Sequence, residues 1–319
     1  MENLLAAWEE FERGKRAKSD VQEFKRYLLY RICTLQRELA TGTYRHGVYA
    51  HFKISDPKPR DIHKAAVRDR LLHHAIYRRL YPSFDSLFIA DSYSCRDRKG
   101  SHRALNRFRT FARRVSGNGR GTCWVLKCDI RKFFASVDQD TLREILRARI
   151  EDSRILDLLE NIIASFNSGT VGKGLPLGNL TSQLLVNIYM NEFDQFAKHI
   201  LKARQYIRYA DDFVFLSQDR LWLESLLPRI RDFLRDHLNL ELHPNKVSIQ
   251  TLASGVDFLG WVHFPDHRVL RTATKKRMFR RLRDQAEAPE TVASYRGLLS
   301  HGNTRKLQAR IESLILPPS

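Results

Sequence analysis

Two adjacent acids, Asp211 and Asp212, interrupt the apolar stretch "QYIRYADDFVFLS" at residues 205–217. The apolar runs on both sides predict a buried hairpin with the acids at its tip. Like charges a few ångströms apart repel each other strongly at reduced dielectric unless a cation lies between them. A solvent-facing Asp-Asp turn is the alternative interpretation of this stretch.

A third acid, Asp129, ends another apolar run, "TCWVLKCD". Three carboxylates at strand ends are the ligands that two Mg²⁺ ions need when they hold an attacking hydroxyl and a leaving phosphate. The acids therefore predict phosphoryl transfer, with Mn²⁺ as a substitute metal, provided that the chain folds Asp129 back to face Asp211.

The overall charge favours a polyanionic partner. The 319 residues include 55 Lys and Arg against 36 Asp and Glu, which gives a net charge of +19 and a pI of about 10.0. Nucleic acid is the first expectation, and anionic lipid or a merely solubilising surface are the alternatives. The N-terminus lacks the layout of a secretory signal, and no apolar run reaches about 18 residues. We expect a cytoplasmic, soluble protein without a membrane partner.

The elements that must position these acids alternate between helices and hairpins. The first 45 residues have a helical pattern, and "VYAHFKISDPKPRDIHKAAVRDRL" predicts a strand, a proline-containing turn and a helix. The run that ends at Asp129 leads to a helix that either Asp138 or Asp140 caps. A long helix precedes the acid hairpin, and an amphipathic helix at about 219–237 follows it. This order predicts an α+β fold. One face of the long helix should be apolar, namely Leu185, Tyr189, Phe193, Phe196 and Ile200.

Seven ordered segments resemble the motifs of reverse transcriptases. "KCDIRKFFASVD", "GLPLGNLTSQLLVNIYMNEFD", "YADD", "NLELHPNK" and "DFLGW" resemble motifs A to E, and two upstream segments, "KPRDIHKAAVRDRLLHHA" and "DSYSCRDRKGSHRAL", resemble the fingers motifs. The resemblance implies a right-hand polymerase that binds an RNA template, a DNA or RNA primer and dNTPs. It implies an N-terminal helical extension at 1–24, fingers at 25–120, a palm at 121–262 and a thumb at 263–319.

The resemblance also implies roles for individual residues. Asp129, Asp211 and Asp212 correspond to metal ligands, with the Ile130 carbonyl as an extra ligand, and Lys246 corresponds to a general acid for the leaving pyrophosphate. Residues that correspond to the dNTP site are Lys53, Arg60, Arg68, Phe134, Leu177 and Gln183. Residues that correspond to primer and template contacts are Phe258, Leu259, Gly260, Lys275, Lys276 and Arg280.

Phe134 corresponds to an aromatic gate that excludes a ribose 2′-OH. Either Phe133 or Phe134 is expected to be core instead. In the thumb, the basic residues should follow a duplex backbone while Met278, Phe279 and Leu282 pack inward. A solvated charged helix is the alternative for that segment.

Motif B resembles the form found in reverse transcriptases of diversity-generating retroelements. Leu177 stands where many relatives have Gln, and Ser182-Gln183 replaces Ser-Pro. Such enzymes copy a template-repeat RNA with frequent errors at adenine, and they work with a small basic pentameric accessory protein. The alternatives are an antiviral defence or orphan bacterial reverse transcriptase that copies a noncoding RNA, an RNA-dependent RNA polymerase, and a non-catalytic RNA-binding protein.

Overall fold

The N-terminal helices form one packed unit with the helix that follows the first hairpin. The computed structural model describes residues 1–55, 59–284 and 289–315. Apolar residues of the first helix at spacings of three and four, including Leu4, Trp8 and Phe11, share a core with Leu71 and Ala75 of the later helix. Residues 1–24 are therefore an integral part of this core. The helices are α1 (Glu2–Glu12), α2 (Ser19–Arg26), α3 (Leu28–Ala40) and α4 (Val67–Leu87).

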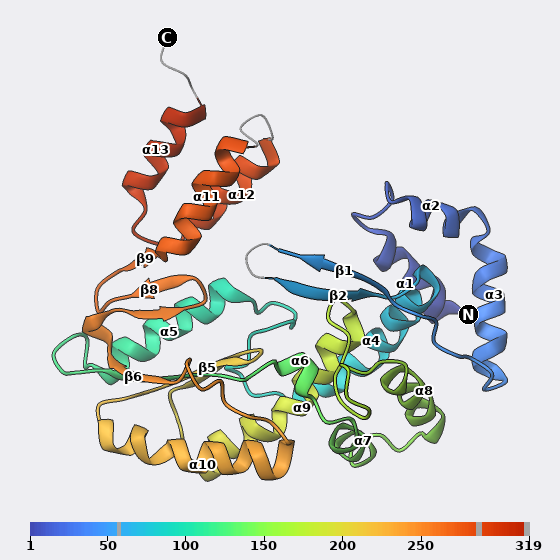
Figure 1. Ribbon diagram of the computed structural model, residues 1–319, viewed down its shortest axis with the longest axis horizontal. Helices are drawn as coiled ribbons and strands as arrows, with labels where there is room; N and C mark the ends of the chain where they lie inside the picture. The colour runs from blue at the N-terminus through green and yellow to red at the C-terminus, as the bar shows by residue number, and fades with distance from the viewer. Residues whose placement is uncertain (56–58, 285–288, 316–319) are drawn as a thin grey trace.

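An exposed antiparallel hairpin, β1 (Ala50–Ile54) and β2 (Arg60–Lys64), projects from these helices toward the opposite side of the molecule (Figure 1). The sequence predicted the first strand and missed the second. The strand β2 reads Arg-Asp-Ile-His-Lys, so it lacks the apolar alternation that marks a half-buried strand. The predicted proline-containing turn falls largely on residues 56–58, outside the described residues.

A four-stranded antiparallel sheet with the strand order β4-β5-β3-β6 forms the centre of the protein. Both of its faces are buried, because alternate residues of each strand enter different cores. Leu126 and Phe213 belong to one core, whereas Val125 and Val214 belong to the other. The strands are β3 (Trp124–Asp129), β4 (Tyr206–Tyr209), β5 (Asp212–Ser217) and β6 (Ser248–Thr251).

Helices α9 (Leu180–Gln195) and α10 (Arg220–Leu238) cover the first face of this sheet. Helix α5 (Ser101–Val115) and a three-stranded antiparallel sheet cover the second (Figure 1). The predicted fingers range extends to residue 120, yet Phe108 and Phe111 of α5 pack in the same core as Val214. The three strands are β7 (Val256–Phe258), β8 (Trp261–His263) and β9 (Arg268–Leu270).

The apolar face predicted for the long helix is wrong at its end. The α-helix changes into a π-helical turn at Phe196–Ile200, in which the Leu201 N–H donates to the Phe196 carbonyl at 2.9 Å. This extra residue per turn rotates the side chains that follow it. Ile200 is consequently exposed, while Leu185, Tyr189 and Phe193 are buried as predicted.

The remaining elements complete the palm and form the thumb. Asp138 caps the helix Gln139–Arg147 by accepting a hydrogen bond from the Thr141 N–H, so the first of the two predicted caps is correct. Among the helices of the described ranges, none is long and apolar enough to cross a membrane. The remaining elements are α6 (Phe133–Ser136), α7 (Gln139–Arg147), α8 (Ser153–Ala164), η2 (Leu252–Ser254), α11 (Thr272–Asp284), α12 (Pro289–Leu299) and α13 (Arg305–Ile315).

Candidate active site

The three acids meet at one end of the central sheet. Asp129 is the last residue of β3, and it lies directly opposite Asp212, the first residue of β5. Directly opposed residues of an antiparallel pair project from the same face. Asp211 lies in the two-residue turn between β4 and β5, and its carbonyl accepts a hydrogen bond from the Ile130 N–H at 3.2 Å. The fold thus brings Asp129 to the hairpin tip, as the sequence predicted.

A fully buried ion pair stabilises the turn between β4 and β5. The Arg208 guanidinium donates to both carboxylate oxygens of Asp194, at 2.8 and 2.7 Å, and both side chains are 0% exposed. The same guanidinium donates to Ser92, Asn187 and the carbonyl of Ala210, which has a left-handed φ of 55°. Arg208 therefore ties the turn to α9 and to the segment before α5. Sequence reasoning missed this pair, although an Arg inside the apolar strand "YIRY" was a visible signal.

Burial and mutual repulsion raise the pKa values of Asp211 and Asp212. Burial, together with the charges of Asp129, Asp211 and Asp257, raises the pKa of Asp212 to about 7, although Lys127 lies 3.8 Å from its carboxylate and opposes the shift. Burial and Asp129 also raise the pKa of Asp211, against the attraction of Lys246 and Arg60. The buried Oδ1 of Asp212 has no hydrogen-bond partner among the described residues. The nearby cations therefore do not fully offset the burial and repulsion of these two carboxylates.

Lys246 reaches the acids from the loop before β6. Its ammonium donates to Asp129 Oδ1 at 2.7 Å, and its side chain is 40% exposed. The loop is attached to the end of β3, because the His243 N–H donates to the Asp129 carbonyl and the Arg131 N–H donates to the Glu241 carbonyl. The Lys246 ammonium and the Asp129 carboxylate are thereby held together.

The residues at the tip fit a divalent cation in their chemistry. Carboxylate oxygens are the preferred ligands of Mg²⁺, and the unpartnered Asp212 Oδ1 provides one that the protein leaves unsatisfied. Within the described part of the chain, however, no three His, Cys, Asp or Glu side chains are already arranged around a common metal position. The Lys246 ammonium contacts Asp129 at the position where a cation would compete for it.

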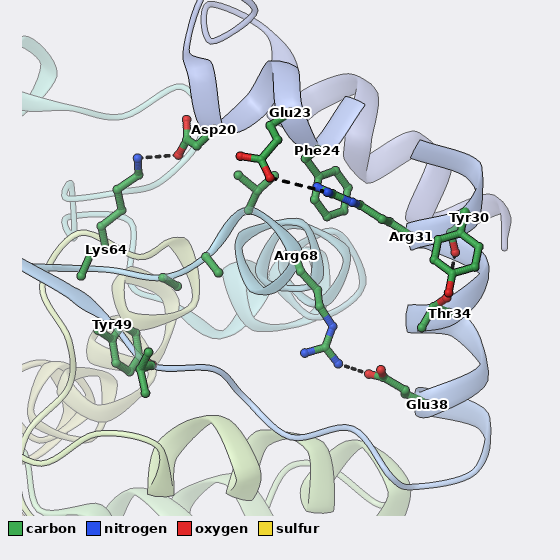
Figure 2. A pocket seen from close by; sticks show the side chains of 15 residues that line it. Asp20, Glu23, Phe24, Tyr30, Arg31, Thr34, Glu38, Tyr49, Lys64 and Arg68 are labelled. Carbon is green, nitrogen blue, oxygen red and sulfur yellow. Dashed lines mark hydrogen bonds and ion pairs between the residues drawn. The ribbon is translucent and has the colours of Figure 1, made fainter. Parts of the chain in front are cut away.

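The predicted cationic residues of the fingers do not all lie near the acids. Arg60, on β2, is exposed, and its charge acts on Asp211, so it lies within electrostatic range of the tip. Lys53 is exposed on β1, opposite Asp61. Arg68 points toward α3, where it pairs with Glu38 and lines a separate cavity of about 800 Å³ (Figure 2). The structure therefore separates Arg68 from the other candidates.

A cavity of about 480 Å³ brings Phe134 and Leu177 together. Phe133 is buried and Phe134 is half-buried, so Phe133 is the core residue of the pair. The Leu177 carbonyl accepts a hydrogen bond from the His63 N–H at 3.1 Å, which joins motif B to the fingers hairpin. His51 and His63, which the sequence analysis did not select, line the same cavity with their rings stacked at 4.9 Å.

Gln183 lies in the first turn of α9 and is half-buried. It is absent from the described lining of the cavity that contains Leu177. Leu177 therefore lines this cavity, whereas Gln183 is placed by the first turn of α9.

The predicted primer-contacting turn joins β7 to β8. Leu259 and Gly260 are its two central residues, with φ values of 50° and 83°. Phe258 is 0% exposed and stacks on Phe108, so its side chain belongs to the core and does not face a primer. This corrects its predicted contact.

In the thumb, one face of α11 carries the predicted basic residues. Lys276 and Arg280 are exposed and Lys275 is half-buried. Met278 and Leu282 are buried on the other face, and Phe279 packs against them partly exposed, as predicted.

The fold and the acid cluster define a nucleic-acid polymerase of the right-hand class. Residues 55–263 match the family described as "Reverse transcriptase (RNA-dependent DNA polymerase)". This match spans more than half of the chain, so the protein belongs to the reverse transcriptase family and is an RNA-directed DNA polymerase.

Two curated relatives have a similar sequence. Protein YkfC of Escherichia coli (strain K12) is 28% identical over 282 residues, which cover 76% of this chain and 71% of that protein. The group II intron-encoded protein LtrA of Lactococcus lactis subsp. cremoris is 23% identical over 320 residues, which cover 77% of this chain and 51% of that protein. The chain thus spans only about half the length of the intron protein.

A solved structure supports the fold alone. The telomerase of Candida albicans superposes with a TM-score of 0.53 at 12% sequence identity, covering 75% of this chain and 46% of that one.

Proposed function

We propose that Asp129, Asp211 and Asp212 hold two Mg²⁺ ions, or Mn²⁺ in their place, during DNA synthesis on an RNA template. The observation that carries this proposal is the opposed pair Asp129 and Asp212 with Asp211 bonded beside it. Bound divalent ions would supply charge stabilisation to the attacking and leaving oxygens. The Ile130 carbonyl is a further candidate ligand.

The residues around the acids have separate tasks in this proposal. Arg60 and Lys53 attract the triphosphate from the exposed hairpin. Lys246 carries the proton that the leaving pyrophosphate requires, and its contact with Asp129 keeps the ammonium within reach. Phe134 lines the cavity in which its ring excludes a 2′-OH. Leu259, Gly260 and the basic face of α11 contact the primer and template.

Primer extension on an RNA template with Mg²⁺ tests the proposal. Asp129→Asn removes one ligand charge, and we expect the rate of DNA synthesis to fall at least about a hundredfold. Asp140→Asn is the matched control, because Asp140 is 83% exposed and pairs with Arg143 away from the tip. Equal rates for wild type and Asp129→Asn would remove the proposed metal role. Preference for NTPs over dNTPs would instead favour the RNA polymerase alternative.

We further propose that the enzyme copies a template-repeat RNA for sequence diversification, with errors concentrated at adenine and with a small basic pentameric accessory protein as partner. Leu177 supports this assignment, because it lines the cavity beside Phe134 with an apolar side chain where a Gln would offer directed hydrogen bonds. The lost discrimination is comparable to one hydrogen bond, about 0.5–1.5 kcal/mol.

Leu177→Gln should therefore lower misincorporation opposite template adenine by about twofold to tenfold. Leu177→Met is the control, since it keeps an apolar contact without a hydrogen-bonding group. Sequencing of the cDNA measures both. An unchanged error spectrum in Leu177→Gln would argue for ordinary packing at this position. The second test is to sequence cDNA made from a noncoding RNA that is encoded beside this gene. Errors concentrated at template adenines would favour diversification, and faithful copies would favour the antiviral or orphan alternative.

A further inference from the structure

A second polar cavity lies where the thumb joins the palm. It has a volume of about 460 Å³ and is bordered by α5, the β8–β9 hairpin and the linker at residues 300–303. Its lining is rich in nitrogen donors. They come from Asn106, Arg109, His263, His267, Arg268, His301 and Asn303.

Two nitrogen atoms of this lining are buried and unsatisfied, and the one on Arg268 is a charged donor. Arg268 donates through Nε to the His301 carbonyl and through Nη2 to Asn106 at 3.1 Å, whereas its Nη1 has no partner among the described residues. His263 is only 3% exposed, and its Nε2 likewise lacks a partner within the described ranges. Buried donors without acceptors are unfavourable, and a charged donor more so. An acceptor is missing from this cavity.

The local charges are also unbalanced. Arg109 is exposed on α5, and its charge adds to the effect of burial in lowering the pKa of Arg268. Burial, followed by the charge of Arg268, lowers the pKa of His263 to about 3, so this ring is neutral. The one acid in the described lining is Asp266, which is 82% exposed and contacts His267 at 2.7 Å. Two guanidinium groups therefore share a cavity without a buried counterion.

We propose that this cavity binds a phosphate group. Arginine forks match phosphate oxygens, and a tetrahedral anion has enough acceptors for donors that approach from α5, β8–β9 and the linker at once. The anion would satisfy Arg268 Nη1 and reduce the repulsion between Arg268 and Arg109. Free inorganic phosphate and a phosphodiester of a bound nucleic acid share this chemistry.

An anion bound in this cavity would connect residues 300–303 of the thumb to the palm. Arg268 holds the His301 carbonyl, and the His301 ring stacks on His102 of α5 at 3.7 Å. Gly302 lies so close to the Trp261 ring that an added Cβ would fall 2.0 Å from one of its atoms. A bound phosphate would thus fasten the linker of the thumb to the palm.

Calorimetric titration of the full chain with sodium phosphate, at constant ionic strength with chloride, is the first arm of the test. Wild type should bind saturably, and Arg109→Gln should bind at least about tenfold more weakly. Arg103→Gln is the matched control, because Arg103 is an exposed arginine on the same helix and does not line the cavity. Arg268→Gln, checked for folding by circular dichroism, should bind as weakly as Arg109→Gln.

The second arm uses a single-stranded oligonucleotide and fluorescence anisotropy. If the ligand is a backbone phosphate, Arg109→Gln should weaken oligonucleotide binding and reduce the salt slope by about 1, while inorganic phosphate binds neither protein. If the ligand is free phosphate, Arg109→Gln should weaken phosphate binding in the calorimetric titration and leave oligonucleotide binding unchanged. Wild-type behaviour of Arg109→Gln and Arg268→Gln in both arms would overturn the proposal. Neither arm measures catalysis, so the result is independent of the proposed metal ligands.

Discussion

The two short hairpin turns of the palm have the same length and opposite chemistry. In each, two residues connect antiparallel strands, between Tyr209 and Asp212 in one and between Phe258 and Trp261 in the other. Each turn begins with a non-glycine residue in the left-handed region, Ala210 at φ 55° or Leu259 at φ 50°. Such residues are uncommon and are found where surrounding structure imposes them.

The surroundings that impose the two turns differ. An aromatic core of Phe108, Phe258 and Trp261 supports the apolar turn. The acid turn rests on the buried Arg208–Asp194 pair and carries carboxylates whose pKa values are raised. The carboxylates of the acid turn repel one another, and contacts outside the turn, such as the Arg208–Asp194 pair, stabilise it. The following predictions test that difference.

Arg208→Met should have the largest effect on stability. It leaves the Asp194 carboxylate buried without its partner, and the free energy of unfolding should fall by about 3–5 kcal/mol. Denaturation in urea measures this loss. The double variant Arg208→Met/Asp194→Leu removes both charges and should recover much of it. A single variant as stable as wild type would show that the pair does not support the acid turn.

Asp211→Asn should separate activity from stability. We expect DNA synthesis to fall at least about a hundredfold, because a candidate ligand charge is lost. The free energy of unfolding should rise, by about 0.5–2 kcal/mol, because burial and Asp129 disfavour the anion. Thermal unfolding in EDTA checks the second expectation. Lower stability than wild type would contradict the proposed repulsion.

The pH dependence of stability in EDTA should reveal Asp212. Its pKa is about 7 in the folded chain and about 3.9 when unfolded, so the folded state binds more protons between these values. The free energy of unfolding should therefore fall as pH rises from about 4 to 7. Asp212→Asn should lose this part of the slope. Millimolar Mg²⁺ should stabilise wild type more at pH 8 than at pH 5, and equal stabilisation at both would count against a metal at the tip.

The turn residues themselves should give the smallest effects. Ala210→Gly relieves the left-handed conformation but adds freedom to the unfolded chain, so a gain of about 0.5 kcal/mol is expected. Leu259→Gly also loses side-chain packing against the second core, and a net loss of about 1 kcal/mol is expected. Urea denaturation of the two variants side by side compares the turns. Changes of the same sign and size would show that both turns are supported alike.

The sequence predicted those parts of the fold whose local pattern agrees with their environment. Asp129 at the end of an apolar run and the Asp pair between two such runs were sufficient to predict the acid cluster, because strand ends determine where side chains emerge. The helix at 219–237 was predicted within a residue at each end, since its apolar period is intact through Pro228.

The remaining features depend on tertiary contacts that no local pattern encodes. The strand β2 is polar because no residue of its hairpin is fully buried: β1 is exposed throughout, and β2 is exposed at its start and half-buried at its end. Arg68 and Arg60 look alike in the sequence, and only the packing of α3 against α4 gives Arg68 the partner Glu38. The partnership of Arg208 with Asp194 likewise needs α9 to lie beneath the hairpin.

The attachment of the Lys246 loop to β3 has a mechanical consequence. Since residues 241–243 hydrogen-bond along residues 129–131, a tilt of the strand carries the lysine with it. The ammonium and the carboxylate of Asp129 would then keep their separation. In the role proposed for Lys246, the proton donor would stay beside the acid even if other parts of the enzyme moved during synthesis.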